Sequence, residues 1–120
     1  MGKYESKEVA FAKDSGISQQ VVSGTDSSQA ITQHSRAGKI TSSTTNLGAK
    51  TTQDITVTNR YCKSGSIILC SVSGGGTGDV VVSRVTPSAG SFIVTILNAD
   101  PSNACNAAYV VRYIIFNVTV

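Results

Sequence analysis

Few residues in this chain could do chemistry, and they are scattered. The only histidine is His34, and the cysteines are Cys62, Cys70 and Cys105. A catalytic histidine needs a nucleophile and an orienting carboxylate held around it. The segment around His34 is rich in Ser and Gln and identifies neither partner. We therefore interpret His34 as a solvated residue.

The three cysteines have no spacing typical of metal ligands. Cys62 and Cys70 could form a disulfide across a short hairpin if their Cβ atoms faced each other. Cys70 lies within the apolar run 67–70, however, where a free thiol behaves as a small buried hydrophobic group. We expect free thiols, and neither a metal nor any other cofactor.

The segment 74–78, with sequence GGGTG, has the glycine content of a phosphate-binding loop. Such a loop needs Gly-Lys-Ser/Thr at the start of a helix, because the lysine and the helix N-terminus bind the phosphates. Here Asp79 and a run of valines follow, so we interpret the segment as a flexible hairpin loop. Asp54, Asp79 and Asp100 stand at strand ends or in loops, where turn and cap roles account for each one separately. A carboxylate pair acting as general acid and base stays conceivable in three dimensions.

Two further features have ordinary explanations. Asn117-Val-Thr119 matches a glycosylation sequon, but the N-terminus lacks the apolar centre of a secretion signal. Tyr61, Tyr109 and Tyr113 could form a sugar-stacking surface, although packing in a core or an interface is the commoner use of such residues. No catalytic constellation emerges, so we expect no enzymatic activity.

The composition is typical of a small β protein. The 120 residues fit one domain, and the charged fraction is only 14%, with Ser, Thr, Gly and Asn filling much of the remainder. The net charge of +3 comes from scattered single cations without interleaved aromatic residues, so we expect no nucleic-acid partner. No apolar stretch reaches the length of a membrane span, so we expect no membrane partner and synthesis in a cytosol.

The clearest predicted strand is 91–98, which follows a turn containing Pro87 and Gly90. Apolar residues occupy most positions on both of its faces, so we expect a central strand covered on each side. The last strand is also apolar on both faces and is therefore either central or covered by another subunit. The other predicted strands are 39–45, 54–59, 66–73, 79–86 and 109–120.

Turn signals recur roughly every 8–12 residues, which is typical of a sandwich or a barrel. The sequence therefore predicts an all-β fold, an antiparallel β-sandwich (jelly-roll-like) with an extended N-terminal arm. We place the arm at residues 1–37 and the β-sandwich domain at residues 38–120. The arm has only small apolar islands, too few to hold an independent fold, so we expect it to dock on this domain or on a neighbouring chain.

An ordered series of short motifs resembles a small domain found among the virion proteins of tailed bacteriophages. The similarity covers roughly residues 28–120, and the cysteines and the segment Asn59-Arg-Tyr61 depart from the family's pattern, in which a small apolar residue is more usual. The motifs are Gly38-Lys-Ile-Thr41, Ile55-Thr-Val-Thr-Asn59, the strand from Ile67 to Val72, the Gly-rich loop, Ala89-Gly-Ser-Phe92, Ile96-Leu-Asn98 and Tyr113-Ile-Ile-Phe116.

The resemblance implies a virion structural protein without catalytic residues. For a separate chain of this size it implies a capsid decoration (cement) protein, which binds the outer capsid surface and bridges neighbouring copies of the major capsid protein. Such proteins often form homotrimers. The expected location is the capsid surface of the virion, after synthesis in the host cytoplasm.

We expect the arm to contact the capsid or a neighbouring copy, and the last strand to pack against another subunit. The alternative is a carbohydrate- or receptor-binding module of a phage tail fibre or baseplate, which would use the loops 74–79 and 98–106. The candidate contact residues for the first reading are Val9, Phe11, Ile17, Val21, Val22, Tyr113 and Phe116.

Overall fold

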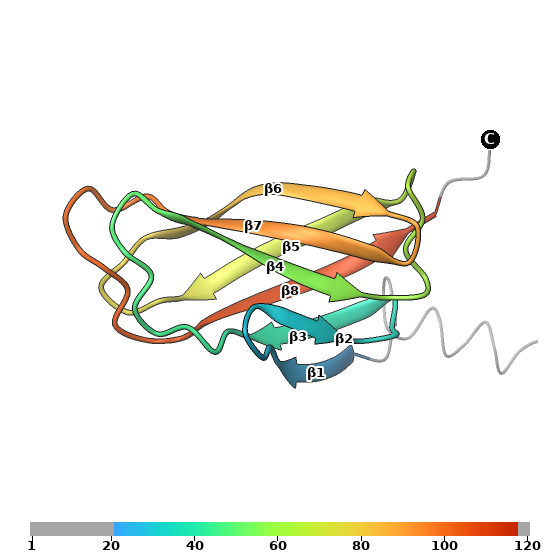
Figure 1. Ribbon diagram of the computed structural model, residues 1–120, viewed down its shortest axis with the longest axis horizontal. Coiled ribbons are helices and arrows are strands. Elements are labelled where there is room, and N and C mark those ends of the chain that lie inside the picture. The colour runs from blue at the N-terminus through green and yellow to red at the C-terminus, as the bar shows by residue number, and fades with distance from the viewer. Residues whose placement is uncertain (1–20, 118–120) are drawn as a thin grey trace, which may run out of the picture.

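The computed structural model describes residues 21–117, which form two four-stranded β-sheets. One sheet, called sheet 1, has the strand order β1-β3-β8-β5, and the other, sheet 2, has the order β2-β4-β7-β6. The two sheets lie face to face as two layers, which confirms the predicted all-β class (Figure 1). The strands are β1 (Val21–Thr25), β2 (Ala30–Thr32), β3 (Ala37–Thr41), β4 (Thr52–Thr58), β5 (Ile67–Gly74), β6 (Val80–Ser88), β7 (Ser91–Asn98) and β8 (Tyr109–Phe116).

The edge strands β1 and β2 depart from the predicted architecture. β1 pairs parallel to β3, and β2 pairs parallel to β4, whereas the inner strands pair antiparallel. Both sheets are therefore mixed, and the prediction of a purely antiparallel sandwich is wrong at these two edges. Residues 21–36, which the sequence analysis places in the arm, contribute β1 and β2 to the two sheets. The predicted contact residues Val9, Phe11 and Ile17 lie outside the described residues.

β7 has the predicted bounds and an interior position between β4 and β6. Its residues Phe92, Val94 and Ile96 are fully buried against sheet 1, as their alternation predicts. The intervening side chains on the outer face are only half-buried. The expectation that protein covers both faces of β7 is therefore wrong for the outer face.

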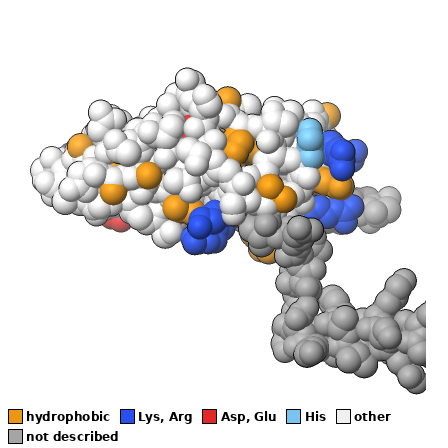
Figure 2. Space-filling view, turned by 90° about the horizontal axis from the view of Figure 1, so that it is seen from below, with side chains coloured by type: hydrophobic (Ala, Val, Ile, Leu, Met, Phe, Trp, Pro, Cys, Tyr) orange, Lys and Arg blue, Asp and Glu red, His pale blue; other side chains and the backbone are white. Residues whose placement is uncertain are grey.

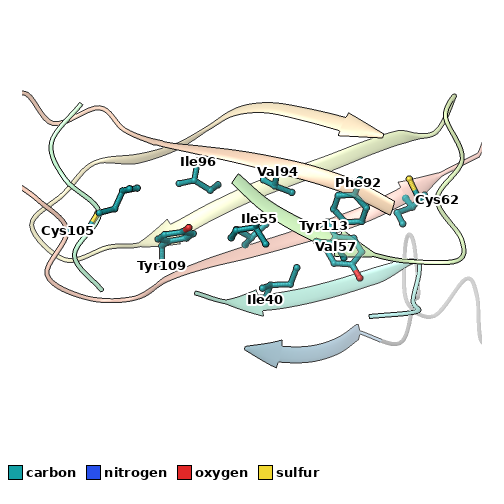
Figure 3. Close-up of a cluster of buried hydrophobic side chains, with 13 residues drawn as sticks. Ile40, Ile55, Val57, Cys62, Phe92, Val94, Ile96, Cys105, Tyr109 and Tyr113 are labelled. Atoms are coloured by element: carbon teal, nitrogen blue, oxygen red, sulfur yellow. The ribbon is translucent and has the colours of Figure 1, made fainter. Parts of the chain in front are cut away.

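The core lies between the two sheets. The rings of Phe92 and Tyr113 pack edge to face, with centroids 5.0 Å apart and an angle of 66° between their planes. Figure 3 shows this pair near Cys62 at one end of the core, and Tyr109 beside Cys105 at the other. Full burial of each large apolar side chain contributes about 2 kcal/mol to stability.

The Gly-rich segment after β5 crosses from sheet 1 to sheet 2, because β5 and β6 belong to different sheets. The interpretation of this segment as a hairpin loop is therefore wrong. Gly76 has a φ of 63°, and a Cβ built there would lie 1.7 Å from Oδ1 of Asn106. Glycine is thus required by the tight crossing between layers, which accounts for the glycine content without a phosphate ligand.

Candidate functional site

The residues singled out for chemistry do not meet in one place. His34 is exposed between β2 and β3, and its Nδ1 accepts a hydrogen bond from the backbone N–H of Arg60 at 3.0 Å. The carboxylate of Asp54 accepts a hydrogen bond from the hydroxyl of Thr95. Within residues 21–117, no three His, Cys, Asp or Glu side chains lie close enough to hold a metal ion.

Asp100 has the turn role predicted for it. Its carboxylate accepts hydrogen bonds from the backbone N–H groups of Ser102 at 2.9 Å and Asn103 at 2.7 Å. These backbone hydrogen bonds lower the pKa of the Asp100 carboxyl below its usual value. The carboxylate therefore organises the loop after β7.

Cys62, Cys70 and Cys105 are free thiols, as predicted. Cys62 and Cys105 are buried in the core, and Cys70 is half-buried on β5. Burial raises the pKa of the Cys70 thiol to about 11, because the thiolate is poorly solvated there. At neutral pH these thiols serve as small apolar groups in the core.

Tyr113 is a core residue of its own chain. Its side chain is 2% exposed, and its hydroxyl donates a hydrogen bond to Oε1 of Gln33 at 2.8 Å. The same hydroxyl lies 3.1 Å from the hydroxyl of Ser35. The subunit contact predicted for Tyr113 needs exposed surface, and this side chain presents almost none.

Phe116, the other residue predicted on the last strand, lies on the outer side of sheet 1. Residues of β8 alternate, so Val111 and Ile115 point into the core while Ile114 and Phe116 point outward. In the antiparallel register Phe116 pairs with Ile67 and Ile114 pairs with Leu69 on β5. Ile67 is 51% exposed and Leu69 is 59% exposed. We call the four side chains Ile67, Leu69, Ile114 and Phe116 the β5–β8 outer face.

The β5–β8 outer face is an apolar surface, and it contains Ile67 and Leu69, the two most exposed large apolar side chains of the described residues. The corresponding outer positions of β4 are exposed polar side chains, Asp54, Thr56 and Thr58 among them. Adjacent apolar side chains left in water on a sheet face are typical of an interaction surface. Of the predicted contact residues on β1, Val22 is 40% exposed and Val21 begins the strand.

A second group of side chains gathers at one end of the sandwich. Cζ of Arg36 lies 5.1 Å from the ring centroid of Tyr61, and Cζ of Arg60 lies 5.2 Å from the same centroid. The guanidinium of Arg60 also donates a hydrogen bond to the phenol oxygen of Tyr61 at 3.2 Å. We call Arg36, Arg60 and Tyr61 the Arg–Tyr cluster. Figure 2 shows Lys and Arg side chains beside the histidine at this end.

Two guanidinium groups give the Arg–Tyr cluster a positive charge. The hydrogen bond from Arg60 and the nearby charges of Arg60 and Arg36 lower the pKa of Tyr61, because they favour the phenolate. From the sequence alone, the segment Asn59-Arg-Tyr61 was noticed only as a departure from a family pattern. Arg36 is remote in sequence and precedes β3, whereas Tyr61 follows β4. Because β3 and β4 belong to different sheets, the approach of Arg36 to Tyr61 depends on the packing of the two sheets face to face.

The loops 74–79 and 98–106, considered for glycan binding, do lie together at the opposite end. The N–H of Thr77 donates to Oδ1 of Asn106 at 2.9 Å, and the Thr77 hydroxyl donates to the carbonyl of Ala104 at 2.8 Å. The polar groups of the two loops are therefore hydrogen-bonded to each other. Neither loop contains an aromatic residue on which a sugar ring could stack.

Comparisons with known protein families, with curated proteins and with solved structures found no match to this chain. Among residues 21–117 there is no helix of the length and apolar character that crossing a membrane requires.

Proposed function

We propose that this chain is a capsid decoration (cement) protein of a tailed bacteriophage. It would bind the outer surface of the head and stabilise it by bridging neighbouring subunits of the major capsid protein, without catalytic chemistry. The observation that carries the proposal is the β5–β8 outer face, an exposed apolar surface on a small β-sandwich. The ordered motifs that resemble phage virion proteins support the same proposal.

Adhesion through the β5–β8 outer face has a simple physical basis. Ile67 and Leu69 are about half exposed, so covering them removes apolar surface from water, worth about 1 kcal/mol for each side chain. A single such contact is weak. A homotrimer presents several copies at once, and simultaneous contacts multiply modest affinities. The trimer and the jelly-roll-like character of the sandwich are parts of this proposal.

The edge strands offer a second means of attachment. Among residues 21–117, β1 and β2 each pair with one neighbour, so the other side of each strand could pair with an added strand. In this proposal residues 1–20 contact the capsid or a neighbouring copy, with Val9, Phe11 and Ile17 as apolar anchors.

Co-sedimentation with capsids assembled without this chain tests the proposal. The full chain should sediment with such capsids, and the double variant Ile67→Thr/Leu69→Thr should bind about tenfold more weakly, since threonine preserves strand propensity while removing apolar surface. Val81→Thr is the matched control, because Val81 is 39% exposed on the edge strand of sheet 2. A full chain that ignores the capsids would refute the proposed function. Equal binding of the double variant and the control would show that the β5–β8 outer face is not the surface that binds the capsid.

A further inference from the structure

The Arg–Tyr cluster places two positive charges beside one aromatic ring. The guanidinium carbons of Arg36 and Arg60 lie 5.1 Å and 5.2 Å from the centroid of Tyr61. Each cation is attracted by the electron-rich ring, but the two cations repel each other. An anion bound between or beside them would replace repulsion with attraction. The arrangement therefore favours an anionic ligand.

The carboxylates of the described residues lie too far away to supply that negative charge. The backbone N–H of Asp26 donates a hydrogen bond to the carbonyl of Thr41, at the end of β3 remote from Arg36. The length of β3 therefore separates Asp26 from Arg36 by about 16 Å. Asp54 lies on β4, and about 20 Å of extended chain separates it from Arg60. Both separations exceed the screening length of about 8 Å at physiological ionic strength.

The remaining two carboxylates of residues 21–117 stand at the opposite end of the sandwich. The backbone N–H groups of Asp79 and Asp100 both donate to Oδ1 of Asn98, at 3.0 Å and 3.1 Å. Asn98 ends β7, whereas the Arg–Tyr cluster lies beyond the end of the antiparallel strand β4. The charges of the described chain are thus separated along its length, with cations alone at the cluster.

The cluster is built on a rigid support. Asn59 is fully buried; its Oδ1 accepts from the N–H of Tyr61 at 2.9 Å, and its Nδ2 donates to the carbonyl of Ser35 at 2.6 Å. These two bonds tie the segment of Arg60 to the segment of Arg36. The carbonyl of Tyr61 accepts a further hydrogen bond from Nδ2 of Asn117 at 3.0 Å. A ligand would therefore meet backbones already in position, which lowers the entropic cost of binding.

We propose that the Arg–Tyr cluster is a binding site for the carboxylate groups of an acidic polypeptide segment. Each guanidinium can donate two parallel hydrogen bonds to one carboxylate. The Tyr61 ring already interacts with both guanidinium groups, which disfavours its use as a stacking platform for nucleic-acid bases. A nucleic-acid strand also needs a track of cations; Lys63 follows the cluster in the same loop, but Arg84 and Arg112 lie within strands away from this end. The site shares no residue with the β5–β8 outer face, although Asn117, which follows Phe116, contacts Tyr61, and the proposal does not depend on capsid binding.

Fluorescence anisotropy with a labelled oligoglutamate peptide tests this site on the full chain. The double variant Arg36→Gln/Arg60→Gln should bind the peptide about tenfold more weakly than the natural chain. The control Arg84→Gln/Arg112→Gln has the same net charge and should change the affinity by less than about twofold. Inorganic phosphate and duplex DNA serve as competitors, and both should displace the peptide less effectively than unlabelled oligoglutamate.

Three results would overturn the proposal. They are an absence of peptide binding, an equal loss in both double variants, and displacement by duplex DNA at lower concentrations than by oligoglutamate. Thermal unfolding monitored by circular dichroism verifies that the variants fold, as expected for exposed arginines. Arg60→Lys provides a second test that preserves the charge: it should bind with intermediate affinity, because lysine lacks the planar fork. Unchanged affinity in Arg60→Lys would count against bidentate recognition of carboxylates.

Discussion

Asn59 and Asn98 are both fully buried, and they occupy equivalent positions at opposite ends of sheet 2. Asn59 immediately follows β4 and Asn98 is the last residue of β7, and these two strands are antiparallel neighbours. Each side-chain amide binds backbone groups of loops from distant parts of the sequence. The two asparagines therefore fix the loops at the two ends of the sandwich, and Asn59 also supports the Arg–Tyr cluster.

The substitution Asn98→Ala should destabilise the fold strongly. The Asn98 amide donates to the carbonyls of Leu47 and Asn103 and accepts from the N–H groups of Asp79 and Asp100. Alanine would leave these buried or half-buried groups without partners, at a cost of about 3 kcal/mol in the free energy of unfolding, measured by urea denaturation.

Asn106→Ala is the matched control for Asn98→Ala. Asn106 is exposed at the same end of the sandwich, where its Oδ1 accepts from the N–H of Thr77. Water can replace this bond, so the cost should be below about 1 kcal/mol. Equal effects of the two substitutions would show that the buried asparagine does not organise these loops.

Gly38→Ala should also destabilise the protein, for a steric reason. A Cβ at Gly38 would lie 2.2 Å from Oε1 of Gln33 and 2.4 Å from the ring of Tyr113. Since both neighbours are buried and hydrogen-bonded to each other, the cost should be at least about 2 kcal/mol in urea denaturation. At Gly65 no atom lies within 4 Å of the added Cβ, so Gly65→Ala should change the stability by less than about 0.5 kcal/mol. A harmless Gly38→Ala would contradict the close approach of β3 to Tyr113.

Stability should fall at alkaline pH, in part through Cys70. Burial raises the pKa of this thiol from 9.0 to about 11, so the unfolded chain loses its proton at lower pH than the folded chain. The stability that comes from keeping the thiol neutral is complete below about pH 9 and is lost as the pH rises to about 11. Burial raises the pKa of Tyr109 and Tyr113 as well, which acts in the same direction.

Urea denaturation at pH 8 and at pH 10.5 measures this dependence. The natural chain should lose stability between the two values, and Cys70→Ala should lose less, because the contributions of Cys105, Tyr109 and Tyr113 remain while that of Cys70 is gone. Cys70→Ala lowers stability at both values through the lost side-chain volume, so the comparison concerns the difference between them. An identical difference in the two proteins would exclude Cys70 as a source of the alkaline loss.

The sequence was most informative where local pattern and burial coincide. β7 combines strict alternation with clear turn residues before it, and its bounds were predicted correctly. The free state of the cysteines followed from their odd number and from the apolar surroundings of Cys70. β1 and β2 were not predicted because they are short, with five and three residues, and their parallel partners are set by pairing between distant segments.

The candidate surfaces were less predictable than the fold. Phe116 was predicted as a contact residue, whereas no residue of β5 was. The outward face of β5 depends on its register with β8, which the sequence does not reveal. Tyr113 was expected at a subunit contact, and its burial against Phe92 follows from the facing of the two sheets. A signal for the buried asparagines was present: an asparagine stands at the end of an alternating strand twice, at Asn59 and at Asn98.

The most direct test of the central claim is hydroxyl-radical footprinting of the chain, free and bound to capsids. Mass spectrometry reports the oxidation rate of each side chain, and a side chain covered by the capsid reacts more slowly. We predict that the oxidation rates of Ile67, Leu69 and Phe116 fall strongly when the chain is bound to capsids. The oxidation rate of Val81 on sheet 2 should stay unchanged. Unchanged rates at the β5–β8 outer face, in a chain that is demonstrably bound, would contradict the account.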